Sequence, residues 1–184
     1  MPARGARMPI SVASPAPRRH GLANPLRALV RAAVTLEGRR PGEITVVLER
    51  DARLRELNRR FRGLDRATDV LAFDYAPAPR AAALRGAKRT GSPPRAPVSG
   101  DILVSLDRME AQAKRFRVTR GRELARLVVH GALHLAGLDH HAPAERARMR
   151  RGEALALRAC AAQIRALERA LDRAARVRNL PERL

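Results

Sequence analysis

The chain has 184 residues, enough for one domain with its own hydrophobic core, and a formal net charge of +20 from 38 Lys and Arg against 18 Asp and Glu. A field of that sign attracts polyanions, so nucleic acid is the first partner that charge predicts; an arginine-rich composition without functional meaning is the alternative. The single cysteine, Cys160, excludes an intrachain disulfide and a thiolate-rich metal site. No apolar run approaches the ~20 residues of a membrane span, so we expect a cytoplasmic protein without a membrane partner.

The N-terminal 22 residues predict a disordered basic arm, because prolines and scattered arginines dominate them. The arm lacks the uninterrupted apolar stretch of a secretory signal, whereas a transit peptide and a true start at Met8 both stay open. We expect a single domain over residues 23–175 and a C-terminal tail over 176–184.

Hydrophobic spacing predicts helices and strands in mixed order from the start of this domain. Leucines and valines at helical spacing from Pro25 predict a helix that Gly38 stops. The short β-branched segment 43–49 predicts a strand. Asp51 is then the expected N-cap of a helix that ends at Gly63.

The pattern continues through the second half of the chain. Residues 68–75 and 100–106 are predicted strands, and the segment 76–98 between them is predicted to be a mobile insertion, because it is rich in proline and basic residues without apolar periodicity. Helices are predicted over 107–116, over 120–136 and from Pro143 to about residue 175. The sequence therefore predicts an α+β fold in which a small mixed sheet packs with about five helices.

Three histidines at a fixed spacing indicate a metal site on a helix and the turn that follows it. His130 and His134 are four residues apart, so they share one helix face and can bind one ion without bending the helix. Gly137 permits a sharp turn because it has no Cβ, and the turn returns His140 toward the pair. Three imidazoles with a vacant fourth position are typical of catalytic zinc, which lowers the pKa of a bound water toward ~7. We expect one zinc ion per chain, although this ligand set also suits nickel, copper or iron.

The same spacing occurs in metzincin proteases, which place a glutamate general base directly after the first histidine. Gly131 stands at that position, and the missing group would cost a peptidase roughly 10²–10⁴-fold in rate. RNA cleavage fits better, because it needs an ion and cationic stabilisation of the phosphorane oxygens. Asp139 either orients a ligand imidazole or shapes the turn before His140, and the sequence leaves both roles open.

Four sequence blocks in the same order resemble the YbeY-type endoribonucleases, also called rRNA maturation factors. The run 130–140 matches the family pattern His-Gly-x-Leu-His-Leu-x-Gly-x-Asp-His at every fixed position. The other blocks are Leu57 to Asp65 followed by Thr68 to Phe73, then Gly100 to Ile102, then Met149 with Glu153. The similarity covers about residues 40–155; Ala67 stands where proline is common, and the 76–98 insertion is longer than usual.

The resemblance implies a single-strand-specific, metal-dependent endoribonuclease in 16S rRNA 3′-end maturation and late ribosome quality control. Its implied partners are single-stranded RNA, especially rRNA, and the small ribosomal subunit with its proteins. By the same matching, Arg62 corresponds to the family's functionally important arginine, and a guanidinium can bind a phosphate through two hydrogen bonds. The expected catalytic residues are Arg62, His130, His134 and His140, the three histidines being the metal ligands. An assembly factor with a structural metal and a metallopeptidase remain as alternatives.

Overall fold

The computed structural model describes residues 10–14, 21–75 and 96–178, and within them four strands and six helices. The strands are β1 (Ile10–Ala13), β2 (Pro41–Glu49), β3 (Val70–Asp74) and β4 (Val98–Ser105). The helices are α1 (Ala23–Leu36), α2 (Asp51–Arg62), α3 (Leu106–Phe116), α4 (Arg120–Leu135), α5 (Pro143–Ala159) and α6 (Ala161–Arg178). The predicted α+β class is confirmed.

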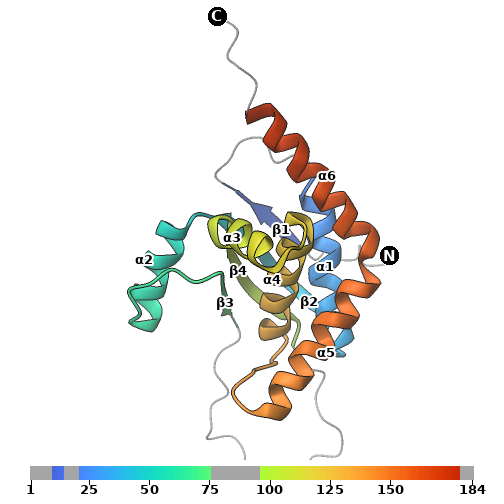
Figure 1. Cartoon of the computed structure of the whole chain (residues 1–184). Coiled ribbons are helices and arrows are strands. Elements are labelled where there is room, and N and C mark those ends of the chain that lie inside the picture. The colour runs from blue at the N-terminus through green and yellow to red at the C-terminus, as the bar shows by residue number, and fades with distance from the viewer. Residues whose placement is uncertain (1–9, 15–20, 76–95, 179–184) are drawn as a thin grey trace, which may run out of the picture.

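The four strands form one mixed sheet in the order β1-β2-β4-β3 (Figure 1). β1, β2 and β4 run parallel to one another, whereas β3 pairs with β4 in the antiparallel direction. β3 is therefore an edge strand.

The two faces of the sheet bury different clusters, because successive side chains of a strand point to opposite faces. On one face the buried side chains of Val46, Ile102 and Val104 join the main core, together with α1 and α4. On the other face a smaller cluster forms where α2 covers the sheet; its buried members are Leu54, Leu57, Leu71 and Leu103.

α4 is the central helix of the main core. It packs against α1, α3, α5 and α6 and against strands β3 and β4. Eleven of its residues are buried, whereas its two histidines are only half-buried and lie toward the edge strand β3. Within the described residues, no helix has both the length and the apolar character that crossing a bilayer needs.

The N-terminal prediction is wrong for four residues. Ile10–Ala13, placed in the disordered arm 1–22, form β1 and pair with β2 in register from Ile10 with Ile44 to Ala13 with Val47. Their alternation of apolar and small residues fits a strand, but four residues are too few to outweigh the surrounding prolines. Residues 1–9 and 15–20 of the predicted arm lie outside the described residues.

The predicted long C-terminal helix is two helices, so there are six helices where about five were expected. The chain breaks at Cys160, which is 5% exposed and lies in the main core, and both α5 and α6 pack against α1 and α4. Tertiary packing rather than a local breaker residue thus sets the bend, and α6 extends to Arg178, into the predicted tail. Residues 179–184 lie outside the described residues.

Two smaller boundaries also differ from the prediction. Asp51 is the first residue of α2 and not its cap; its carboxylate accepts hydrogen bonds from the Ser105 hydroxyl and the Arg108 guanidinium. Val98, placed in the 76–98 insertion, begins β4 and is buried. Residues 76–95 of the predicted insertion lie outside the described residues.

Candidate metal centre

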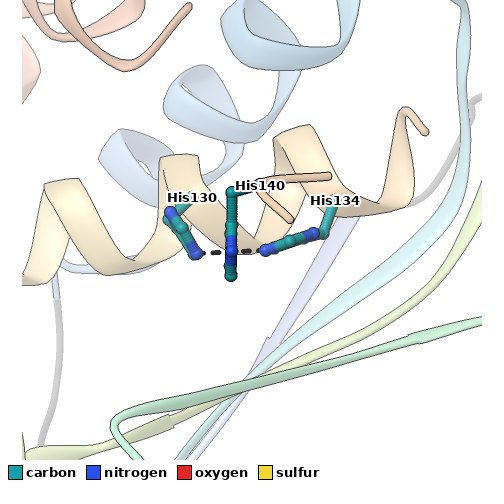
Figure 2. A group of neighbouring side chains, drawn as sticks. All are labelled: His130, His134 and His140. Carbon is teal, nitrogen blue, oxygen red and sulfur yellow. Dashed lines mark hydrogen bonds between the residues drawn. The ribbon is translucent and has the colours of Figure 1, made fainter. Parts of the chain in front are cut away.

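The end of α4 determines where the third histidine lies. The backbone N–H of Leu138 donates to the carbonyl of Leu133 at 3.0 Å, and that of Gly137 donates to His134 at 2.9 Å. These two bonds close the last turn, and they require a positive φ, which is +97° at Gly137. The chain therefore leaves the helix sharply, and His140 returns to lie over the helical pair (Figure 2).

The rings of His130, His134 and His140 face a common point. Nε2 of His130 lies 3.1 Å from Nε2 of His134, and one ring nitrogen from each of the three lies within 4.8 Å of the others. A tetrahedral ion with Zn–N bonds of ~2.0–2.1 Å holds its ligand nitrogens about 3.3 Å apart. The Nε2 atoms of His130 and His134 are close to that spacing, and a ring nitrogen of the more exposed His140 lies within 4.8 Å of them. The three residues therefore fit one metal ion.

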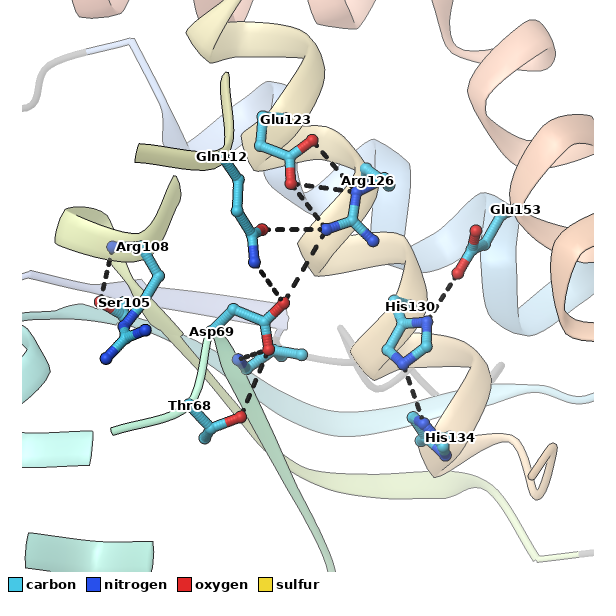
Figure 3. A network of polar contacts seen from close by, with 11 residues as sticks. Thr68, Asp69, Ser105, Arg108, Gln112, Glu123, Arg126, His130, His134 and Glu153 are labelled. Carbon is cyan, nitrogen blue, oxygen red and sulfur yellow. Dashed lines mark hydrogen bonds and ion pairs between the residues drawn. The ribbon is translucent and has the colours of Figure 1, made fainter. Parts of the chain in front are cut away.

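Each helical histidine is held through its other ring nitrogen. Nδ1 of His130 lies 2.6 Å from Oε1 of Glu153 (Figure 3). Nδ1 of His134 lies 2.9 Å from the carbonyl oxygen of Leu138. Both partners are acceptors, so each Nδ1 carries the proton and each Nε2 keeps its lone pair for a metal. Neither contact could be read from the spacing of the motif, because Glu153 comes from α5 and the Leu138 group is backbone.

The pKa of His134 is lowered to about 4, first by burial and then by the neighbouring His130 and His140. Burial disfavours the charged imidazolium, and a second and third positive ring nearby would repel it. His134 is therefore neutral at pH 7, which is the form that binds a metal.

Asp139 shapes the turn rather than holding a ligand ring. Its Oδ1 accepts a hydrogen bond from the backbone N–H of His140 at 2.8 Å, and this bond is the main reason why the pKa of Asp139 is lowered. Its Oδ2 lies 3.1 Å from Nε2 of His141, whose side chain is 83% exposed and outside the three-histidine cluster. Of the two roles left open by the sequence, the structure supports the turn.

Arg62 lies in the wall of the same cavity as the three histidines. The cavity has a volume of about 710 Å³, and its other wall is formed by Thr68, Asp69 and alternate residues along the whole of β3, namely Val70, Ala72 and Asp74. Arg62 is the last residue of α2, which ends because Gly63 adopts φ +68° and turns the chain toward β3. All four predicted site residues are thus brought to one cavity, although Arg62 is 68 positions from His130 in the sequence.

A polar network that the sequence did not predict fixes the wall opposite the histidines (Figure 3). The Asp69 carboxylate accepts from the backbone N–H of Val70 at 3.0 Å and from the Gln112 amide at 3.1 Å. The Gln112 carbonyl accepts in turn from Arg126 at 3.1 Å, and Arg126 pairs at 2.6 Å with Glu123, which is 2% exposed. The network ties the start of β3 to α3 and α4.

Gly131 allows α4 to lie close against the sheet. A Cβ at this position would lie 2.6 Å from Cγ2 of Ile102 and 3.3 Å from Cγ2 of Val70. A glutamate, which metzincin proteases need here, would force the helix away from β4. The close packing at Gly131 therefore leaves no room for the glutamate that transfers protons in metzincin proteases.

These features define a class: a small α+β protein with a cluster of three histidines that could hold a metal ion and an arginine on one open cavity. A family model described as Endoribonuclease YbeY matches residues 19–161. The chain is 40% identical over 152 residues to an Endoribonuclease YbeY of Anaeromyxobacter sp. (strain Fw109-5), covering 83% of this chain and 72% of that one. It is 45% identical over 121 residues to one of Roseiflexus sp. (strain RS-1), covering 65% and 71%.

A solution structure of TM1509 from Thermotoga maritima is also similar, with a TM-score of 0.49 and 26% identity, over 81% of this chain and 89% of that one. On the family match and the curated relatives, the chain belongs to the YbeY endoribonuclease family, which confirms the resemblance found in the sequence. By that membership it is an RNA-cleaving hydrolase.

Proposed function

We propose that the protein is a single-strand-specific endoribonuclease that depends on one divalent ion, zinc in the first place, held by His130, His134 and His140. It acts in the cytoplasm in 16S rRNA 3′-end maturation and late ribosome quality control, with the small ribosomal subunit as its partner. The observation that carries the proposal is the convergence of three imidazoles beside Arg62, in one cavity of a chain from an endoribonuclease family.

The chain's own residues account for binding and orientation. Glu153 and the Leu138 carbonyl hold two imidazoles with Nε2 toward the common point. The Arg62 guanidinium binds a non-bridging phosphate oxygen and stabilises the charge that grows there during cleavage. A divalent ion held by the three histidines would supply Lewis acidity and activate a water molecule.

The size of the cavity supports the proposed selectivity for unpaired RNA. A cavity of about 710 Å³ can accept one or two nucleotides but not a base-paired helix. A single strand can turn its backbone into such a cavity, whereas a duplex would first have to unpair.

Two alternatives, a metallopeptidase and a protein with a purely structural metal, fit the site less well than the proposed nuclease. A metallopeptidase needs a glutamate where Gly131 packs against Ile102. A purely structural metal usually takes a fourth protein ligand, and among the described residues the cluster contains the three histidines alone. The open fourth position favours catalysis.

The proposal is tested with metal analysis and an rRNA cleavage assay on wild type, His134→Ala and Arg62→Ala. We expect about one ion per chain and cleavage in the wild type, and loss of both in His134→Ala. Arg62→Ala should keep its metal and lose cleavage by roughly 10²-fold or more, since it removes a phosphate-binding cation. Cleavage that survives in metal-free His134→Ala would overturn the metal-dependent mechanism, and wild-type cleavage by Arg62→Ala would overturn the role of Arg62.

A further inference from the structure

A second, smaller cavity adjoins the metal centre. Its volume is about 340 Å³, and it shares Arg62 and Thr68 with the larger cavity. Its remaining lining comes from the end of α2, the loop before β3 and the start of α3: Asn58, Leu64, Arg66, Ala67 and Arg108. Arg62 and Thr68 therefore lie where the two cavities adjoin. We call this smaller space the loop pocket.

The lining of the loop pocket suits a nucleotide. Three guanidinium groups line it, and of these only Arg108 has an ion-pair partner among the described residues, Asp51 at 3.0 Å. Arg62 and Arg66 are exposed and have no carboxylate partner in that part of the chain. Leu64 is 43% exposed and offers an apolar surface for a base. Unpaired cations beside an apolar surface match a phosphate and its neighbouring base.

The loop pocket is preformed. The buried side chain of Asn58 donates from Nδ2 to the carbonyl oxygen of Arg66 at 2.8 Å, which holds the loop against α2. A two-bond ion pair between Arg55 and Asp65, at 2.8 and 2.7 Å, holds the middle of the same loop.

We infer that the loop pocket binds one unpaired nucleotide next to the phosphodiester at the metal centre, with its phosphate on Arg66 and Arg108. The inference rests on the proposed function and adds to it a binding subsite. Arg62 then contacts the phosphate between the two nucleotides, because it lines both cavities. A preformed subsite of this kind selects single strands, since a paired neighbour could not enter it.

The test measures binding of labelled oligouridylates of two to six nucleotides in the presence of chelator, so that metal-dependent cleavage does not interfere. In the wild type, affinity should rise with each added nucleotide until both cavities are filled. In Arg66→Gln one of these increments should shrink roughly five- to tenfold, since one charge-assisted phosphate contact is lost. The salt slope of log K should also become less steep by about 0.7.

Two further variants keep the result interpretable. Arg66→Lys retains the charge and should keep most of the salt slope. Arg165→Gln removes an exposed arginine of α6 outside both cavities and should leave every increment in place. The inference is overturned if Arg66→Gln weakens all lengths equally or behaves like Arg165→Gln. If Arg66→Gln gives either of these results while the wild type cleaves RNA, the subsite alone is rejected. If Arg66→Gln reduces one affinity increment of the wild type but the wild type cleaves no RNA, the proposed nuclease function alone is rejected.

Discussion

Glu153 lies 2.6 Å from Nδ1 of His130 but comes from a different helix, so it can orient the imidazole independently of α4. Partners of this kind typically contribute 10–100-fold to metal affinity. We expect Glu153→Ala to weaken zinc binding by at least about tenfold, and Glu153→Gln to weaken it less, because the amide oxygen still accepts from Nδ1–H.

Competition with a chromophoric chelator measures this affinity, and Glu56→Gln on the exposed side of α2 serves as the control. Equal zinc affinity in Glu153→Ala and the control would show that the contact does not position His130.

Tyr75 is the only tyrosine, and the chain has no tryptophan, so its phenol can be titrated directly by ultraviolet absorbance. A hydrogen bond to Asp101 raises its pKa to about 12, with burial adding to the effect, because both stabilise the neutral phenol. Asp101→Asn should return the midpoint toward ~10. A wild-type midpoint near 10 would mean that Tyr75 is not bonded to Asp101 and that this end of β3 is differently placed.

The placement of the three histidines close together could be predicted from the sequence because their geometry is local. The spacing of His130 and His134 within one helix, and of Gly137 before His140, follows from helix periodicity and turn stereochemistry alone. Arg62 could be assigned to the site only through the family resemblance, because its position beside the histidines depends on how α2 packs against β3. The role of Glu153 was not predicted for the same reason.

The contact between α4 and β4 sets the position of the whole metal centre. Gly131→Ala would place a Cβ 2.6 Å from Ile102, in a fully buried part of the core. Overpacking of this kind lowers the free energy of unfolding by about 1–3 kcal/mol. The better helix propensity of alanine raises it by up to about 1 kcal/mol. We expect a net loss of unfolding free energy and weaker metal binding, because the helix that carries two ligands must shift.

Chemical denaturation checks this expectation. A double-mutant cycle with Ile102→Ala, which removes the methyl group that clashes, is the control. The losses of unfolding free energy in Gly131→Ala and Ile102→Ala should sum to more than the loss in the double variant. Strict additivity would contradict a steric origin.

Element-level prediction failed where tertiary packing decides the outcome. β1 is too short to be recognised among prolines, and it exists through its pairing with β2. The bend at Cys160 has no glycine or proline to mark it, and it arises as α5 and α6 both cover α1 and α4. Strands β2 to β4 and helices α1 to α4 carry stronger local patterns, and their sequence-based ranges agree with the structure within a few residues.

The net charge of +20 acts over the whole molecule and predicts a strong dependence of RNA binding on salt. Three phosphate contacts, by Arg62, Arg66 and Arg108, give a slope of about −2 for log K against log salt with single-stranded RNA. Anisotropy titrations over a range of salt concentrations measure this slope. A flat response would mean that these arginines do not contact phosphates.

The proposed metal-dependent cleavage requires three imidazoles to share one ion. X-ray absorption spectroscopy of the zinc-loaded protein tests this directly, because it reports the type, number and distance of the ligands. We expect three imidazole nitrogens at ~2.0–2.1 Å, recognised by the multiple scattering of their rings, and one oxygen ligand in the fourth position. Fewer than three imidazoles, or a sulfur ligand at ~2.3 Å from the only cysteine, Cys160, would contradict the site.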